Sequence, residues 1–344
     1  MSAHSPSFQF NPHSNPQPSP LPIFDALNAY QKTMALKGAL ELDIFTHIAD
    51  GAITAGEIAK KCDGAERGVR ILCDFLTING LLTKTDGKYG LTQDTAVFLN
   101  RHSPAYLGGA AKFLAHERHM SHFKDVAAAV RKGGALDAGN MGPDDPVWIE
   151  FAESMGQMIG SVSRMVAPLV TEPGKPTKVL DIAAGHGLFG ISVAELNPAA
   201  EVVAVDWKNV LNVASANAAK AGVSSRYHTI PGSAFDVDFG HGYDLVLLPN
   251  FLHHFNPPTN VTLLKKIRSA MKPGGLVATV EEVPNDDRIS PPIATFSMMM
   301  LCSTPSGDAY TFRELDQMFR EAGFGESTTR NLEPSFATLL LTKW

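Results

Sequence analysis

The chain has 344 residues, of which 44% are apolar and 19% charged, so it has room for two domains and for buried cores. Its formal net charge of −6 gives no electrostatic reason to bind nucleic acid or an anionic membrane. The three cysteines lack paired spacing, and neither a signal peptide nor an uncharged run of the ~18–20 residues that span a bilayer is present, so we expect a cytoplasmic, soluble protein.

Residues 1–22 form a proline-rich segment in which the other residues are mainly Ser, Asn and Gln. A segment of this composition has too little apolar surface to offset the entropy of ordering. We therefore expect a disordered tail.

Residues 23–103 are expected to form a compact helical domain with a β-hairpin. Thr54 and Glu57 have the spacing of a capping box, Gly80 ends a helical pattern, and Asp86-Gly87 is a typical hairpin turn. The order helix, helix, β-ribbon is that of a winged helix. The predicted elements are helices over 23–48, 54–61 and 66–79 and strands over 81–85 and 88–91.

A winged helix raises the alternative of a DNA-binding regulator. Between residues 23 and 101 we count nine basic and ten acidic residues, and acids lie within the helix that would read the DNA. DNA readers concentrate positive charge there. Dimerisation is favoured instead, because the first helix is apolar on more than one side.

Residues 104–170 are predicted to be a helical linker, with helices over 105–133 and 147–170. Methionine and aromatic residues at helical spacing are more often core than ligand contacts, but a segment between two domains also favours a pocket. Three histidines, at 116, 119 and 122, share a helical spacing without acid or cysteine partners, so no metal site is expected.

Residues 171–344 alternate between apolar strands and helical patterns, which predicts an α/β domain with a largely parallel sheet. A helix is predicted from Thr311 to Ala322. The predicted strands cover 178–182, 201–205, 226–230, 243–248 and 275–281, followed by an antiparallel pair over 327–331 and 337–342.

A glycine-rich turn follows the first of these strands, in Asp181-Ile182-Ala183-Ala184-Gly185-His186-Gly187-Leu188-Phe189-Gly190. Its glycines allow backbone N–H groups to approach a ligand, and Asp206, ending the next strand, is placed to accept from ribose hydroxyls. The spacing also matches a dinucleotide fingerprint, so an NAD-dependent dehydrogenase is an alternative. Asp181 argues against it, because a carboxylate suits an ammonium or sulfonium ligand better than a pyrophosphate.

These motifs, with Tyr243–Leu248 and Met271-Lys272-Pro273-Gly274-Gly275, resemble the class I S-adenosylmethionine-dependent methyltransferases. The whole chain resembles the bacterial branch of the small-molecule O-methyltransferases of the caffeate, isoflavone and hydroxyindole type. The resemblance implies a winged-helix-like dimerisation domain that forms a homodimer, followed by a Rossmann-like domain that binds S-adenosylmethionine.

The resemblance also implies catalytic residues. Leu252-His253-His254-Phe255 occupies the place of the family's Leu-His-Asp-Trp, which assigns the general base to His253 and leaves the role of His254 open. Glu281 matches the acid that orients the base. A second orienting acid has no clear counterpart, although Asp308 lies nearby in sequence.

The implied cofactor site gathers around the strand ends. Asp181 and the backbone of Gly185 and Gly187 are expected to hold the methionine portion, and Asp206 the ribose, while Gly190 is expected to allow close packing. Ser233 stands where the family usually has an acid facing the adenine. The remaining expected contacts are Trp207, Phe235 and Asn250.

The expected chemistry is an in-line displacement, in which alignment of donor and acceptor supplies much of the acceleration. A phenol with a pKa near ~10 is a poor nucleophile, and an imidazole with a pKa near ~6.5 is suited to take its proton. No metal is needed.

The acceptor is expected to be flat and largely apolar, such as a phenol, an indole or a polyketide ring. Transfer to carbon or nitrogen, or a relative that binds the cofactor without methylating, is the alternative on the same fold. The residues expected to line the acceptor pocket are Trp148, Met155, Met158, Phe255, Met298 and Met299.

Overall fold

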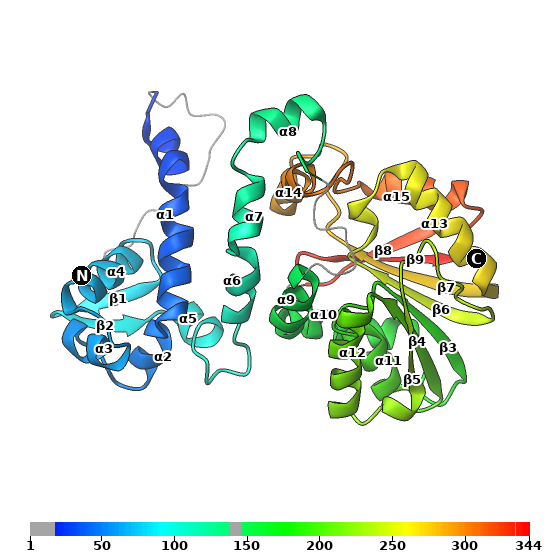
Figure 1. Cartoon of the computed structure of the whole chain (residues 1–344), viewed down its shortest axis with the longest axis horizontal. Helices are drawn as coiled ribbons and strands as arrows, with labels where there is room; N and C mark the ends of the chain where they lie inside the picture. Colours follow the sequence, from blue (N-terminus) through cyan, green and yellow to red (C-terminus); the bar gives the residue numbers. More distant parts are fainter. Residues whose placement is uncertain (1–17, 138–145, 334) are drawn as a thin grey trace. The chain divides into compact units, whose positions relative to one another are not determined.

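The computed structural model describes residues 18–137, 146–333 and 335–344, and it divides the chain into two compact units, residues 1–96 and 97–344 (Figure 1). The predicted tail lies outside the described residues up to residue 17, and the first helix begins at Leu21 rather than at residue 23. None of the described helices combines the length and the apolarity that a bilayer crossing requires. The finer division of the second unit at residue 170 stays a prediction.

The first unit has the predicted order of helices and ribbon. The capping box of Thr54 and Glu57 is confirmed, and Asp86 and Gly87 both have positive φ in the hairpin turn. The single helix predicted over 23–48 is wrong, because Asp43 has a φ of 53° and divides it into two helices. The elements are α1 (Leu21–Glu41), α2 (Ile44–Ala49), α3 (Ala55–Lys61), α4 (Glu66–Ile78), β1 (Leu82–Thr85), β2 (Lys88–Leu91) and α5 (Gln93–Phe98), the last of which extends past residue 96.

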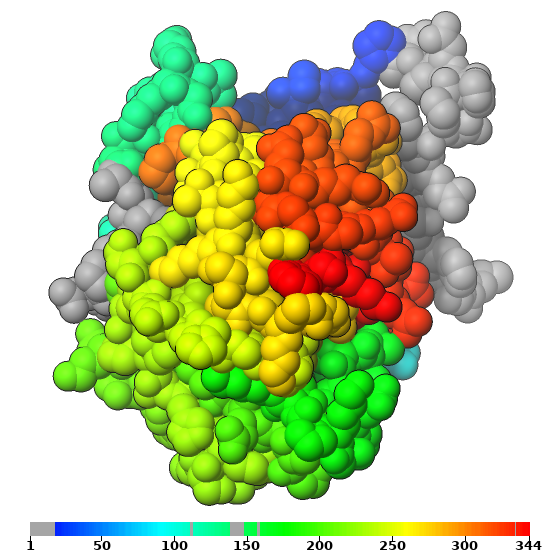
Figure 2. All heavy atoms as spheres, turned by 90° about the vertical axis from the view of Figure 1, so that its right-hand side faces the viewer, coloured from blue at the N-terminus to red at the C-terminus, as the bar shows by residue number. Residues whose placement is uncertain are grey.

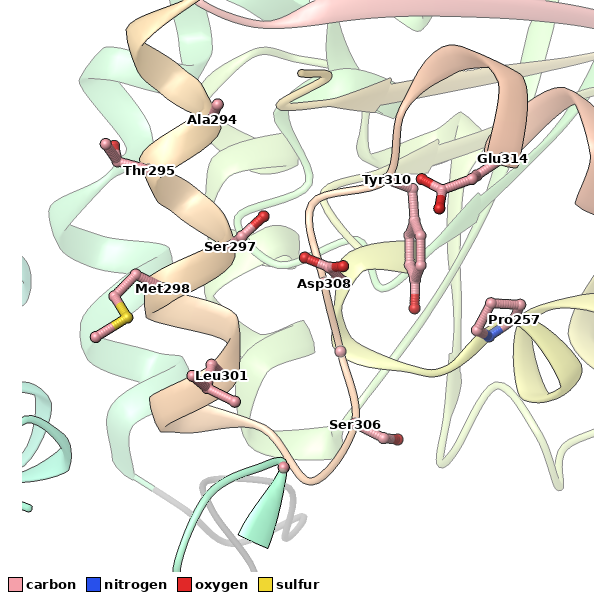
Figure 3. A pocket seen from close by; sticks show the side chains of 12 residues that line it. Pro257, Ala294, Thr295, Ser297, Met298, Leu301, Ser306, Asp308, Tyr310 and Glu314 are labelled. Atoms are coloured by element: carbon pink, nitrogen blue, oxygen red, sulfur yellow. The ribbon is translucent and has the colours of Figure 1, made fainter. Parts of the chain in front are cut away.

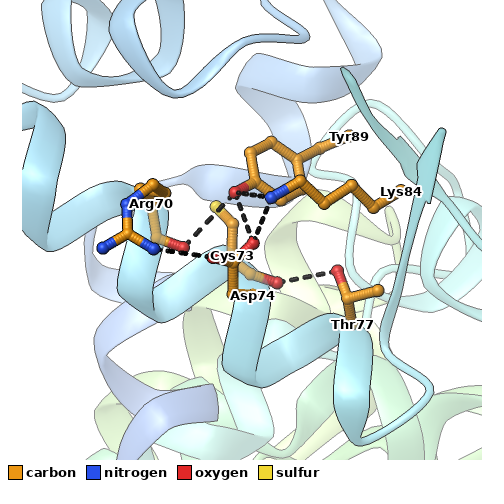
Figure 4. Close-up of polar contacts among 6 residues, drawn as sticks. All are labelled: Arg70, Cys73, Asp74, Thr77, Lys84 and Tyr89. Atoms are coloured by element: carbon orange, nitrogen blue, oxygen red, sulfur yellow. Dashed lines mark hydrogen bonds and ion pairs between the residues drawn. The ribbon is translucent and has the colours of Figure 1, made fainter. Parts of the chain in front are cut away.

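A polar cluster fastens α4 to the ribbon (Figure 4). The Asp74 carboxylate accepts hydrogen bonds from Lys84 at 2.5 Å, from the Tyr89 hydroxyl at 2.7 Å and from Arg70 at 3.0 Å. These bonds hold the pKa of Asp74 below its usual value. Arg70 and Lys84 therefore already have an acidic partner, Asp74, within this unit.

The helix α1 exposes much of its apolar surface. Leu27 is 64% exposed and Phe24 56%, and of the residues of this helix only Ala39 and Leu40 are buried. A row of large exposed apolar side chains on one helix is typical of an interface.

The second unit is built on a seven-stranded sheet in the order β5-β4-β3-β6-β7-β9-β8. The first five strands in this order are parallel, and β9 runs antiparallel to both β7 and β8. The predicted strands are confirmed with small shifts, the largest at β7, which begins at Met271. The strands are β3 (Thr177–Ile182), β4 (Ala200–Asp206), β5 (Tyr227–Pro231), β6 (Tyr243–Pro249), β7 (Met271–Glu281), β8 (Ser327–Asn331) and β9 (Thr338–Lys343).

Helices cover both faces of this sheet (Figure 1). Neighbouring strand residues alternate between two cores, so that Val179 of β3 packs in one and Leu180 in the other. The first core contains α10 (Gly156–Val170), α11 (Leu188–Leu196) and α12 (Lys208–Lys220). The second contains α13 (Pro257–Ala270) and α15 (Phe312–Glu321), which lie side by side in Figure 2. The predicted α/β class is confirmed.

The helical segment before the sheet is more broken than predicted. His116 and Asp125 accept backbone hydrogen bonds as N-caps, and Gly133 ends a helix with a φ of 80°, so the helix predicted over 105–133 is three helices. Met155 separates two further helices. This segment contains α6 (Gly108–Leu114), α7 (Glu117–His122), α8 (Val126–Lys132) and α9 (Pro146–Ser154), and α14 (Phe296–Ser303) follows the strand β7.

Candidate active site

The glycine turn after β3 is tied to the end of β4. Gly185 has a φ of +57°, and its N–H donates to Asp206 Oδ2 at 2.8 Å. The other Asp206 oxygen accepts from the Trp207 N–H at 2.6 Å. Burial raises the pKa of Asp206 to about 6, against the effect of these two bonds. The carboxylate is thus held at the strand end with its remaining lone pairs available to a ligand.

Asp181 lies behind this turn. Its Oδ2 accepts from the Gly190 N–H at 3.0 Å, and its Oδ1 is buried without a hydrogen-bond partner. Burial raises its pKa well above the usual value. An unpaired buried carboxyl oxygen is costly, and among the described residues none supplies the missing partner.

The two later glycines of the motif serve packing. A Cβ on Gly190 would lie 2.7 Å from Val202 and 2.8 Å from Asp181, and one on Gly187 would lie 2.5 Å from the Tyr227 hydroxyl. The Gly187 N–H donates to Ala184 O at 2.7 Å. Gly187 therefore lies against α12 and β5 instead of in the cavity wall, unlike Gly185.

A cavity of ≈ 460 Å³ extends along the carboxyl edge of the sheet, from the end of β5 past β4, β3 and β6 to β7. This is the edge where open α/β sheets bind ligands, and the volume is in the range of ligand sites. Twelve of the predicted residues line it, namely Trp148, Met155, Gly185, Asp206, Trp207, Ser233, Phe235, Asn250, His253, His254, Phe255 and Met299.

A buried imidazole–carboxylate pair occupies the β6–β7 end of the cavity. His253, in a short 3₁₀ helix (Leu252–His254), places Nδ1 2.5 Å from Glu281 Oε2. The other Glu281 oxygen accepts the N–H groups of Phe251 at 3.0 Å and Leu252 at 2.8 Å. No described residue forms a hydrogen bond with His253 Nε2.

The charge state of His253 follows from two opposed effects. Burial lowers its pKa, and the neighbouring Glu281 carboxylate raises it by more, so the pKa lies above its usual value. His254 has no such partner: burial and the adjacent His253 lower its pKa well below the usual value. Its Nδ1 is buried and unpartnered, and its ring meets Trp148 edge-on at 5.6 Å. His254 is thus a neutral wall residue beside the buried pair.

Aromatic rings line the β5–β6 end of the cavity. Phe255 contacts both Phe235 and Phe251 edge-on, with ring centroids 5.0 Å apart in each case. Ser233 lies in the wall here, and so does Asp236, whose N–H donates to Ser233 O at 2.9 Å. An acid that the sequence motif did not indicate therefore lies in the wall three residues after Ser233.

Asn250 shapes the exit from β6. It adopts a φ of 53°, which asparagine tolerates better than most residues, and its N–H donates to Val280 O at 2.7 Å. This turn directs the chain from β6 into the 3₁₀ helix that carries His253.

The structure does not place two of the predicted pocket residues, Met298 and Met158, in the cavity wall. Met298 is 39% exposed and lines a separate surface hollow (Figure 3). Successive residues on α14 point about 100° apart, so Met299 faces the cavity instead. The side chain of Met158 lies outside what the structure describes.

Asp308 also belongs to the surface hollow. Its carboxylate pairs with Arg288 at 3.1 Å, whereas its backbone N–H donates to His253 O at 3.0 Å. It contacts the His253 segment through its backbone and not as a second carboxylate at the imidazole.

Several cavity residues escaped the sequence analysis. His186, inside the glycine motif, stacks on Phe151 at 6.4 Å, and burial lowers its pKa to about 4. His119 lines the wall, and burial likewise lowers its pKa to about 4. Position within the motif could have drawn attention to His186, whereas nothing local marked His119. Others include Phe113, Phe189, Ile159, Glu282, Met300 and Thr304.

The geometry supports one kind of chemistry. A hydroxyl placed at His253 Nε2 could transfer its proton to the ring, and Glu281, hydrogen-bonded at Nδ1, would stabilise the resulting imidazolium. The other end of the same cavity offers a ribose-type acceptor in Asp206 and aromatic rings.

Comparison with known proteins assigns the family. The O-methyltransferase domain family matches residues 149–325, and the O-methyltransferase dimerisation domain family matches residues 24–101. The chain is 28% identical to the 3-hydroxy-5-methyl-1-naphthoate 3-O-methyltransferase of Streptomyces sahachiroi, over 90% of this chain and 91% of that protein.

Solved structures agree. A protein of Nostoc punctiforme, provisionally assigned as an O-methyltransferase, is 48% identical with a TM-score of 0.92, over 96% of this chain and all (100%) of that chain. Human N-acetylserotonin methyltransferase, solved with S-adenosylmethionine, has the same fold at 21% identity with a TM-score of 0.79, over 96% of this chain and 99% of that one. The chain belongs to the O-methyltransferase family.

Proposed function

We propose that this protein transfers a methyl group from S-adenosylmethionine to a hydroxyl of a small aromatic metabolite, with His253 as the general base. The observation that carries the proposal is the buried His253–Glu281 pair, with Nε2 unbonded by any described residue, in the same cavity as Asp206. We also expect the enzyme to be cytoplasmic.

The residues around the glycine turn suit a sulfonium nucleoside. Asp206 would accept from the ribose hydroxyls, and a Cβ added to Gly185 would have no atom closer than 3.9 Å, so the backbone there is open to a ligand. Asp181, whose pKa burial raises, would add negative potential behind the turn only in its ionised form. When bound, the cofactor supplies the electrophilic methyl group.

At the adenine end we expect Phe235 and Trp207 to contact the ring faces. Asp236 takes the place expected for an acid at position 233, where it would accept from the amino group. Asn250 would border the cofactor and acceptor portions of the cavity.

The acceptor portion would position and desolvate a ring. Trp148, Met155, Phe255 and Met299 form an apolar wall around His253, which holds an aromatic acceptor close to the base and excludes water. The base then takes the hydroxyl proton at Nε2 as the carbon–oxygen bond forms. Met158 and Met298 remain weaker candidates for acceptor contacts.

Transfer to carbon is the second candidate, because one relative, 22% identical over 87% of this chain, is the L-tyrosine C(3)-methyltransferase of Streptomyces lavendulae. A base beside the acceptor serves oxygen transfer most directly, since it converts a weak nucleophile into a strong one. The atom that receives the methyl group distinguishes the two.

The test uses methyl-labelled S-adenosylmethionine with a library of phenols, indoles and quinones, read by mass spectrometry. A labelled O-methyl product that His253→Ala reduces by about 10²-fold or more supports the proposal. The control is binding of S-adenosylhomocysteine, which His253→Ala should leave unchanged. Carbon-bound label, or full activity in His253→Ala, would contradict it.

We further propose a homodimer formed through the first unit. The exposed apolar side chains of α1 support it, as does the match to a dimerisation domain family. The pairing of Arg70 and Lys84 with Asp74 supports a role in assembly over one in nucleic-acid binding.

A further inference from the structure

A second carboxylate lies beside the catalytic pair. Glu282 directly follows Glu281 at the end of β7, and ligand atoms of His253, Glu281 and Glu282 all lie within 4.8 Å of one another. Glu282 lines the cavity, whereas Glu281 is turned away into its bonds with His253 and the 3₁₀ helix. The two adjacent acids therefore have different surroundings.

Glu282 lacks a partner from elsewhere in the fold. Within the described part of the chain, no other residue donates a hydrogen bond to its carboxylate, and the neighbouring cavity wall includes Phe296 and Met300. A partly buried carboxyl without such a donor is costly, and ligand sites keep such groups because the ligand satisfies them.

The position of Glu282 restricts where a donor would come from. Because a carboxylate oxygen of Glu282 lies within 4.8 Å of a ring nitrogen of His253, a group bound to it would lie close to the hydroxyl that loses its proton to Nε2. Two neighbouring oxygens on one ring match this arrangement. A carboxylate there would be repelled by Glu281 and Glu282 together.

We propose that Glu282 selects acceptors carrying a second hydroxyl next to the one that is methylated, so that the substrate class is a vicinal dihydroxy aromatic compound. The second hydroxyl donates to Glu282 and keeps its proton, while the first loses its proton to His253. This inference rests on the proposed function, since it assumes that the acceptor binds at His253.

The test measures binding and not methyl transfer. Calorimetric titrations of the protein saturated with S-adenosylhomocysteine would compare 2,3-dihydroxynaphthalene with 3-methoxy-2-naphthol, which lacks the second donor. We expect the wild type to bind the diol about tenfold more tightly, the scale of a hydrogen bond to a charged group. Glu282→Leu should bring the two affinities within about twofold.

Two further variants serve as controls for the binding measurements on Glu282→Leu. Glu201→Gln changes an exposed glutamate on β4 of the same sheet and should keep the wild-type preference. If Glu282→Leu no longer binds S-adenosylhomocysteine, Glu282→Gln replaces it, and there the preference should fall at least threefold.

A wild type without preference, a wild type that binds neither naphthol, or a Glu282 variant that keeps the preference would overturn the inference. Its failure is distinguishable from failure of the proposed function. Methyl transfer without diol preference overturns only the role of Glu282, whereas selective diol binding without methyl transfer overturns only the reaction.

Discussion

His253 and Glu281 form a hydrogen bond of 2.5 Å between Nδ1 and Oε2, although they come from the ends of two different strands. Because Glu281 also accepts from the backbone of the 3₁₀ helix, one carboxylate holds both the imidazole and the loop that carries it. The bond at Nδ1 leaves Nε2 as the nitrogen that would take the proton of an acceptor in the proposed reaction.

Replacing Glu281 by Gln should lower kcat on the order of 10²-fold and shift the pH profile. The carboxylate raises the pKa of His253 above 6.5, so the acid limb of kcat/KM lies above pH 6.5 in the wild type. In Glu281→Gln burial is opposed only by the nearby Glu282, so the pKa of His253 should fall and the acid limb should move to lower pH. An unshifted limb in steady-state profiles would assign that ionisation to another group.

Cofactor affinity should weaken in acid. Ribose hydroxyls donate to ionised Asp206, whose pKa is about 6, so binding favours the deprotonated form. The affinity for S-adenosylhomocysteine should therefore be constant above about pH 7 and fall by up to roughly tenfold per pH unit below about pH 6. Calorimetry from pH 5 to pH 8 measures this, and Asp206→Asn should bind more weakly with a flatter profile.

Activity should not depend on a metal ion. The cluster of His253, Glu281 and Glu282 has the residue types of a cation site, but His253 Nδ1 and both Glu281 oxygens are already engaged in hydrogen bonds. We expect unchanged kcat after dialysis against EDTA and no stimulation by Mg²⁺. A loss that Mg²⁺ or Zn²⁺ restores would contradict a metal-free mechanism.

Gly190→Ala should destabilise the protein by about 1–3 kcal/mol, because its Cβ would overlap Val202 and Asp181. Gly68→Ala is the matched control: this position in α4 has no atom within 4 Å of an added Cβ, and the change should be neutral or stabilising by about 0.5–1 kcal/mol. Urea unfolding of both variants measures the difference.

Leu27→Asp should dissociate the proposed dimer. The substitution places a charge in the exposed apolar surface of α1, which would have to be desolvated in an interface. We expect light scattering to report a dimer for the wild type and a monomer for the variant, whereas Lys60→Ala, on the exposed side of α3, should stay dimeric. Equal masses for the wild type and Leu27→Asp would exclude this surface.

The central strands of the sheet were predictable, because β3, β4 and β6 are apolar runs between turn residues. The positions of helix breaks were not, since Asp43, His116 and Asp125 act through backbone conformation and capping that a continuous apolar spacing conceals.

The candidate site was likewise predictable only in part. His253 and Glu281 were predicted from the resemblance, whose motif places both at strand ends. Asp236 and His119 were not, because each reaches the cavity through a turn or a short helix whose geometry depends on packing. Met298 shows the limit of predicting a wall from adjacent residues on a helix, since one residue of rotation separates the cavity from the surface.

Gly307 ties the position of the loop after α14 to that of His253, the proposed base. A Cβ at this position would lie 2.1 Å from the carbonyl oxygen of His253, the same oxygen that accepts from the Asp308 N–H. A variant in which α14 is exchanged to change the acceptor would therefore have to retain the Gly307-Asp308 dipeptide. Any larger residue at 307 would displace His253 together with the cavity wall that α14 forms.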